Sequence, residues 1–241
     1  MGDRVHVFAA DAWVTAAADY LADAIAASVG ERGGCRLALA GGSTPAPVYQ
    51  RLAKIERVPW SHVTFFFGDE RAVGPEDEAS NYAMARRTLF DPLGVPGDRI
   101  ARIEGERAPE DARAHYATRL GDVALDLVLL GMGGDGHTAS LFPGSDGAGA
   151  TGPVVVTTSP IAPATRISLT YDAIGEAGEV VFLVGGASKA SRLAEVHAQR
   201  RSDTPTLPAA RVHDRSGHAT WLLDDAAAAE LSPQLRQGTR R

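Results

Sequence analysis

Short apolar runs alternate with amphipathic stretches along the chain, which is the pattern of an α/β protein. Runs rich in branched and aromatic residues predict strands at 5–9, 35–40, 63–67, 123–130, 154–158, 166–171, 180–184 and 219–223. Stretches with one apolar face or helix-forming composition predict helices at 11–29, 46–55, 80–89, 110–120, 190–197 and 224–231. We therefore expect a mostly parallel central sheet flanked by helices.

Four of the predicted strands end in glycine or polar residues. The segments that follow them are GGST at 41–44, DER at 69–71, GMGGDGHTASLFPGS at 131–145 and GGASK at 185–189. In open α/β sheets, ligands bind outside the carboxyl ends of the strands. We expect these segments to meet in one pocket and take the stretch at 131–145 as its centre.

The glycines at 131–136 match the G-x-G-x-x-G pattern of a dinucleotide-binding turn. The context does not fit that site, because PVVV stands at 153–156 where an acidic residue is expected, and Pro143 would cut the helix short. His137 is left as a candidate general acid or base, or as a hydrogen-bonded surface histidine. Asp135 could orient its imidazole or cap the following turn.

The other strand ends each allow two interpretations. The amides and hydroxyls of Gly42, Ser43 and Thr44 form either a phosphate receptor or an ordinary capped helix start. Asp69 and Arg71 belong either to a site or to a solvated charge cluster, and Lys189 either enters the pocket or faces water. Convergence on one sheet edge favours the functional interpretation of all of them.

Several other classes of site lack support in the sequence. No histidine or cysteine pair has metal-ligand spacing, HExxH is absent, and no G-x-S-x-G elbow occurs. We therefore expect no metal and no cofactor.

Composition narrows the possibilities further. Lys and Arg total 24 against 30 Asp and Glu, for a net charge of −6, and the basic residues are scattered, so nucleic acid is not an expected partner. The single cysteine, Cys35, is expected to be a buried apolar residue. No secretory signal or membrane-spanning run is visible, which predicts a cytoplasmic protein without membrane partners.

The length fits one domain over 1–241, with 232–241 as a flexible tail and the Gly-rich 144–152 as a surface loop. The state of assembly stays open between a monomer and a small homo-oligomer.

The segments LALAGGSTP, FFFGDERAVGPEDEASNYAMA, DLVLLGMGGDGHTASLFPGS, RISLT and FLVGGASK, in this order, make the chain resemble the 6-phosphogluconolactonase family. The resemblance covers 37–224 and is most specific in DGHTASLFPG. It implies a single-domain, modified Rossmann-type α/β fold shared with sugar-phosphate isomerases and deaminases. It also implies hydrolysis of 6-phospho-D-glucono-1,5-lactone without metal or nucleotide.

In that resemblance His137 matches the proposed general base, and Arg71 and Lys189 match phosphate- and substrate-binding residues. Which of the two cations meets the phosphate stays open. Asp69 could bind sugar hydroxyls or hold Arg71. The nearest alternative is an isomerase or deaminase on the same fold, but its deaminase branch reads DEY where this chain has DER ending in Arg71. A non-catalytic sugar-phosphate-binding module is the remaining alternative.

Overall fold

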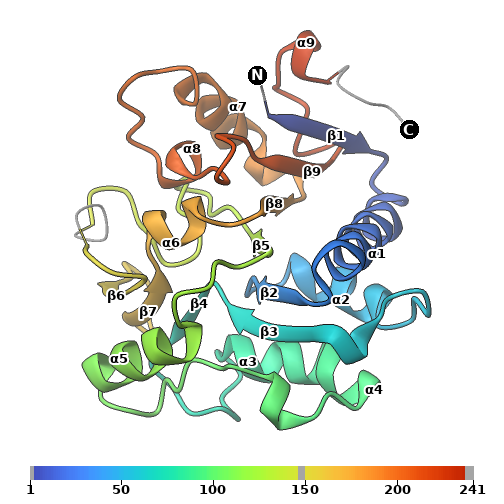
Figure 1. Cartoon of the computed structure of the whole chain (residues 1–241). Coiled ribbons are helices and arrows are strands. Elements are labelled where there is room, and N and C mark those ends of the chain that lie inside the picture. The colour runs from blue at the N-terminus through green and yellow to red at the C-terminus, as the bar shows by residue number, and fades with distance from the viewer. Residues whose placement is uncertain (1–2, 146–149, 237–241) are drawn as a thin grey trace.

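The computed structural model describes residues 3–145 and 150–236 and is built around a six-stranded sheet (Figure 1). The strand order is β1-β9-β8-β5-β2-β3, and every neighbouring pair is parallel. The strands are β1 Arg4–Phe8, β2 Cys35–Leu39, β3 Val63–Phe67, β5 Leu127–Leu130, β8 Glu179–Val184 and β9 Thr220–Asp224. Every residue of β5 is buried, as expected for a strand covered on both faces. The predicted parallel sheet is confirmed.

A second, three-stranded antiparallel sheet lies beside the first. It has the order β4-β7-β6 and consists of β4 Asp69–Arg71, β7 Thr165–Leu169 and β6 Val154–Thr158. Only Gly68 separates β4 from the end of β3, so the chain passes directly from one sheet into the other. The sequence predicts no strand at 69–71, but this segment pairs with β7, far along the chain. Asp69 and Glu70 are buried there, so the alternative of a solvated charge cluster is wrong for these two residues.

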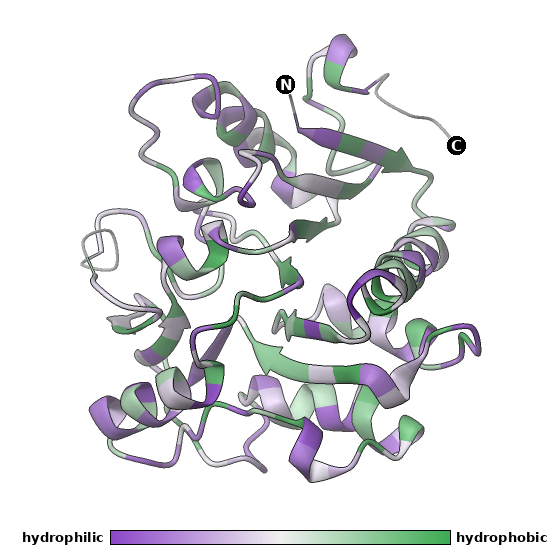
Figure 2. Ribbon diagram, in the orientation of Figure 1, coloured by the Kyte–Doolittle hydropathy of each residue, from purple (hydrophilic) through white to green (hydrophobic). Residues whose placement is uncertain are grey.

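Helices cover the large sheet, and their apolar faces complete its core (Figure 2). In the longest helix, α1, Leu21 and Ile25 are fully buried, and α1 packs against α2. The helices are α1 Trp13–Arg32, α2 Pro45–Leu52, α3 Asn81–Ala85, α4 Asp91–Leu93, α5 Pro109–Leu120, α6 Tyr171–Gly175, α7 Ala190–Gln199, α8 Pro208–Arg211 and α9 Pro233–Arg236.

Several predicted boundaries differ from the structure. The helix expected to stop at residue 89 continues through a π-helical stretch, Arg86–Phe90, into α4, which carries Pro92 in its first turn. The wider π-helical turn changes the hydrogen-bond spacing just before the proline, which lacks an N–H. The helix predicted at 224–231 is a series of turns, and β5 begins at Leu127 rather than at residue 123.

The predicted tail and Gly-rich loop fall partly outside the described residues. Residues 233–236 of the tail form α9, and Leu235 packs against the core; the flexibility of the tail stays a prediction. Residues 237–241, and 146–149 of the loop, lie outside the described residues.

The order of strands brings three connecting turns together. β2, β5 and β8 are successive neighbours in the large sheet and run parallel, so their carboxyl ends lie at one edge. The turns beyond them contain 41–44, 131–137 and 185–189. This edge is where the sequence predicts a pocket.

Candidate active site

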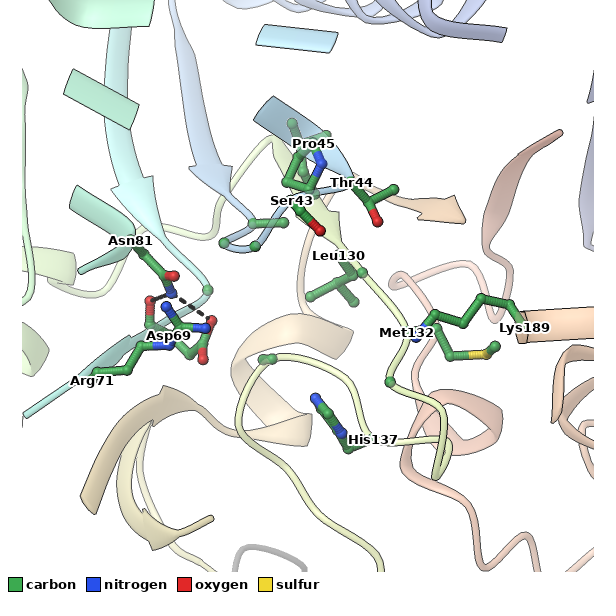
Figure 3. Close-up of a pocket in the computed structure, with 18 residues that line it drawn as sticks. Ser43, Thr44, Pro45, Asp69, Arg71, Asn81, Leu130, Met132, His137 and Lys189 are labelled. Carbon is green, nitrogen blue, oxygen red and sulfur yellow. Dashed lines mark hydrogen bonds between the residues drawn. The ribbon is translucent and has the colours of Figure 1, made fainter. Parts of the chain in front are cut away.

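A cavity of about 250 Å³ lies at the carboxyl edge of the parallel sheet (Figure 3). Its lining includes seven of the predicted site residues, which are Gly42, Ser43, Thr44, Asp69, Arg71, His137 and Lys189. Asp135 does not line this cavity, but its carboxylate contacts the His137 ring. The structure therefore brings all the predicted site residues to one edge of the sheet.

The His137 imidazole reaches into the cavity from the turn that follows β5 (Figure 3). Its Nδ1 lies 2.6 Å from Oδ1 of Asp135, and its side chain is 33% exposed. A carboxylate at this distance accepts the Nδ1 proton, so the neutral ring carries its lone pair on Nε2. The arrangement leaves Nε2 as the nitrogen that can accept a proton from a bound molecule.

Asp135 holds both the ring and the backbone of His137. The same Oδ1 accepts a hydrogen bond from the backbone N–H of His137 at 3.1 Å. Burial alone would raise the pKa of Asp135, but the hydrogen bonds and the charge of His137 outweigh it and lower that pKa. Both contacts foreseen for Asp135, with the imidazole and with the following turn, are thus present together.

Glycine is required where the His137 ring lies against the backbone of its own turn. A Cβ on Gly133 would overlap Nδ1 of the His137 ring and Oδ1 of Asp135. Gly136 has a φ of 86°, a conformation that glycine adopts without cost. The turn is fixed from outside by hydrogen bonds from the Ala209 amide to the Gly136 carbonyl and from Arg192 Nε to the Gly134 carbonyl. The glycines therefore determine where the imidazole stands.

The turn at 41–44 presents two free hydroxyls. Ser43 and Thr44 point toward the middle of the cavity (Figure 3), and within the described chain neither hydroxyl makes a hydrogen bond. Thr44 is the N-cap residue of α2, but its side chain makes no capping hydrogen bond. The alternative of an ordinary capped helix start is therefore wrong, and the hydroxyls are available to a ligand.

Arg71 and Lys189 stand on opposite sides of the cavity, with His137 between them (Figure 3). Lys189 comes from the turn after β8 and directs its ammonium inward. Arg71, on β4, donates from Nη1 to the carbonyl of Ala79. The expectation that Asp69 could hold Arg71 is not met, because no hydrogen bond or ion pair joins these two described side chains.

The Asp69 carboxylate is buried and instead holds two neutral groups. It accepts hydrogen bonds from the Ser140 hydroxyl and from Nδ2 of Asn81, the latter at 3.1 Å. Asn81 is buried and lines the cavity, and its Oδ1 has no hydrogen-bond partner within the described part of the chain. A Cβ on Gly41 would overlap this amide.

Glu70 is a buried acceptor behind the cavity. Its Oε1 accepts from the backbone N–H groups of Arg71 and Asn81, and its Oε2 accepts from the Tyr82 N–H and the Ser80 hydroxyl. Burial raises the pKa of Glu70 more than these hydrogen bonds lower it. Glu70 thus ties β4 to the start of α3.

Sequence reasoning missed Asn81 and Arg166, which stand at or beside the site. It treated Asn81 as part of a helix start and Arg166 as part of a strand. A polar residue at either place gives no signal of a cavity, because only the pairing of β4 with distant segments brings both to the site.

Two further properties concern only the described residues. Within 3–145 and 150–236 there is no group of three His, Cys, Asp or Glu side chains placed to hold a metal ion. Nor does that part of the chain include a helix long and apolar enough to cross a membrane.

Comparison with known proteins places this arrangement in a family. Residues 9–221 match the family model described as glucosamine-6-phosphate isomerases/6-phosphogluconolactonase. A protein of Haemophilus influenzae named 6-phosphogluconolactonase is 37% identical over 198 residues, which are 79% of this chain and 85% of that one. A protein of Mycobacterium bovis with the same name is 36% identical over 248 residues, 96% of this chain and 99% of that one.

The solved structures agree with these relatives. The crystal structure of 6-phosphogluconolactonase from Thermotoga maritima superposes with a TM-score of 0.82 at 30% identity, over 91% of this chain and 98% of that one. The likeness therefore extends over nine-tenths of this chain.

Proposed function

The chain belongs to the family of glucosamine-6-phosphate isomerases and 6-phosphogluconolactonases, and we propose that it hydrolyses 6-phospho-D-glucono-1,5-lactone to 6-phospho-D-gluconate in the oxidative pentose phosphate pathway. The observation that carries the proposal is the His137 imidazole, held at Nδ1 by Asp135 and free at Nε2, inside a cavity that also presents Ser43, Thr44 and Lys189. A base and an anion-binding turn in one cavity suit a phosphorylated ester.

In the proposed reaction His137 acts as base and then as acid. Nε2 takes a proton from water as the water oxygen attacks C1 of the lactone, forming a tetrahedral intermediate. The C1 carbonyl then re-forms, the bond from C1 to the ring oxygen breaks, and His137 returns the proton to that oxygen. The new carboxylic acid ionises and releases one proton to solvent. General acid–base catalysis of this kind contributes roughly 10²- to 10⁴-fold to the rate.

The proposed phosphate site is the turn before α2. The backbone amides of Gly42, Ser43 and Thr44 and the two hydroxyls would face the phosphate oxygens. Pro45, the first residue of α2, has no N–H, so the amides before it supply the donors. Lys189 adds a positive charge from the neighbouring turn. Substrate bound this way brings its lactone end toward His137.

Proton release tests the reaction. The purified enzyme should release protons from freshly made 6-phosphogluconolactone faster than the spontaneous background. Absence of that release would contradict the proposal, and ammonia from glucosamine 6-phosphate would point to the deaminase alternative. Binding of the sugar phosphate with no turnover would point to a binding module. A cytoplasmic location and a monomer or small homo-oligomer stay predictions.

The two lysines of the chain provide a matched test of the phosphate site. Lys189→Ala should reduce kcat/KM more on the phosphorylated lactone than on unphosphorylated glucono-1,5-lactone, because only the first carries the phosphate. Lys54→Ala, at an exposed position, is the control and should change neither value. Equal losses on both substrates would remove Lys189 from the phosphate site.

A further inference from the structure

Two arginines stand directly opposite each other in the small sheet. Arg71 on β4 and Arg166 on β7 are register partners in an antiparallel pair, so their side chains leave the same face. Like charges at such positions repel each other. A negative charge nearby would offset the repulsion between the two guanidinium groups.

The protein itself supplies little of that charge. Arg166 is 7% exposed. Among the residues that the structure describes, its Nε has no hydrogen-bond partner, and its Nη2 makes only two long contacts, with Ser159 Oγ and the Ile161 carbonyl, both at 3.4 Å. Neither Arg71 nor Arg166 forms an ion pair with any residue that the structure describes. The buried guanidinium of Arg166 is therefore poorly compensated, and an unpaired buried charge is costly.

Electrostatics agrees with the geometry. Burial lowers the pKa of Arg166, and the charge of Arg71 lowers it further, while the carboxylates of Asp69 and Glu70 act in the opposite direction. An anion bound between the two guanidinium groups would offset the cost of burying the Arg166 charge and would reduce the repulsion between the two arginines.

Both arginines line a second cavity of about 790 Å³ that adjoins the first. Asp69, Arg71, His137 and Ala139 line both cavities, whereas Ser43 and Lys189 line only the first and Arg166 only the second. Arg71 thus borders both cavities and stands across the first one from Lys189 (Figure 3). Arg166 borders only the second cavity, which Ser43, Thr44 and Lys189 do not line.

From this placement we infer that Arg71 and Arg166 form a second anion site, which binds the oxygen atoms on C1 at the lactone end of the substrate. This inference rests on the proposed function. As the water oxygen bonds to C1, the carbonyl oxygen gains negative charge, which the guanidinium groups would stabilise. After the ring opens, the same groups would hold the carboxylate of the product.

Equilibrium binding of two product analogues tests the inference apart from catalysis. 6-Phosphogluconate carries a phosphate and a carboxylate, whereas glucitol 6-phosphate carries only the phosphate. By calorimetry, Arg166→Met should bind 6-phosphogluconate roughly 10- to 100-fold more weakly, the effect of losing one charge-assisted hydrogen bond. The same variant should bind glucitol 6-phosphate within about twofold of wild type, and Lys189→Ala should bind both ligands more weakly.

Two binding results would overturn the inference. In one, Arg166→Met binds 6-phosphogluconate as tightly as wild type, which removes Arg166 from the site. In the other, the variant loses both ligands equally, which assigns Arg166 to the phosphate. If wild type binds both ligands but does not hydrolyse the lactone, the proposed function fails while the binding comparison still decides the anion site.

Stability and a conservative variant separate ligand binding from a structural role. Arg166→Met removes a like-charge contact and should melt at or above the wild-type temperature. Melting well below it would show that Arg166 holds the fold and would overturn the inference. Arg166→Lys keeps the charge and should retain most of the affinity for 6-phosphogluconate. A loss in this variant as large as in Arg166→Met would contradict a charge-based role.

Discussion

The two sides of the cavity are built by different means. We call the turns at 41–44, 131–137 and 185–189 the loop wall, and β4 together with Asn81 the sheet wall. The loop wall positions its side chains through backbone conformation beyond three parallel strands. The sheet wall positions its side chains through buried hydrogen bonds, centred on the carboxylates of Asp69 and Glu70.

Because of this difference, substitutions in the two walls should reduce activity in different ways. In the loop wall, one added methyl group is enough to displace the imidazole, because the His137 ring lies against the backbone of its own turn. In the sheet wall, a change must break a buried polar contact, so loss of function should come with loss of stability. Substitutions in each wall can separate these two modes of failure.

Gly133→Ala should have the largest effect among these variants. The new Cβ overlaps the His137 ring and the Asp135 carboxylate, so the imidazole must move. Misplacing a catalytic group by about 1 Å can cost roughly 10²-fold in rate, and we expect a loss in kcat of that size with a nearly unchanged melting temperature. The measurement is steady-state lactone hydrolysis together with thermal unfolding.

The neighbouring glycine is the matched control for that variant. A Cβ on Gly134 meets no atom within 4 Å, and Gly134 has no positive φ, so Gly134→Ala should keep wild-type activity. Equal activity in the two variants would show that contact with the His137 ring does not set the rate.

Glu70→Gln should lower stability through the sheet wall. An amide has one acceptor oxygen, so its NH₂ group would face a backbone N–H that now binds Glu70, such as that of Tyr82. A buried unsatisfied N–H costs about 1–3 kcal/mol, and we expect the free energy of unfolding in urea to fall by that amount. Glu78→Gln, at an exposed position, should change it little. Unchanged stability in Glu70→Gln would contradict the role given to Glu70.

Gly41→Ala tests the contact between the walls and should have the smallest effect of these variants. Its Cβ overlaps the Asn81 amide, which would have to give up its hydrogen bonds with Asp69. The loss of about one net hydrogen bond, roughly 1 kcal/mol, should lower kcat/KM by several-fold and stability by a similar energy. Gly131→Ala, where a Cβ meets nothing within 4 Å, is the control.

The sequence predicted the loop wall better than the sheet wall, for a physical reason. Parallel buried strands have a recognisable apolar pattern, and their carboxyl ends meet at one edge, so the sequence alone places the site around His137, Ser43, Thr44 and Lys189. The positions of these side chains depend mainly on local turns, which glycine and proline residues in the sequence indicate.

The sheet wall depends on contacts between distant segments. β4 has only three residues, DER, which by themselves are typical of a solvated charge cluster, and it is a strand because β7 pairs with it. The burial of Glu70 and Asn81 likewise arises from packing that no local pattern encodes. Arg166 became a candidate only when the register placed it opposite Arg71.

The central claim is that the His137 imidazole, fixed by Asp135, activates water for attack on the lactone. The most direct measurement is enzyme-catalysed proton release from 6-phosphogluconolactone by purified His137→Ala, corrected for spontaneous hydrolysis, with the exposed His62→Ala as control. The account predicts a loss of roughly 10²- to 10⁴-fold for His137→Ala and none for His62→Ala. Hydrolysis by His137→Ala at the wild-type rate would contradict it.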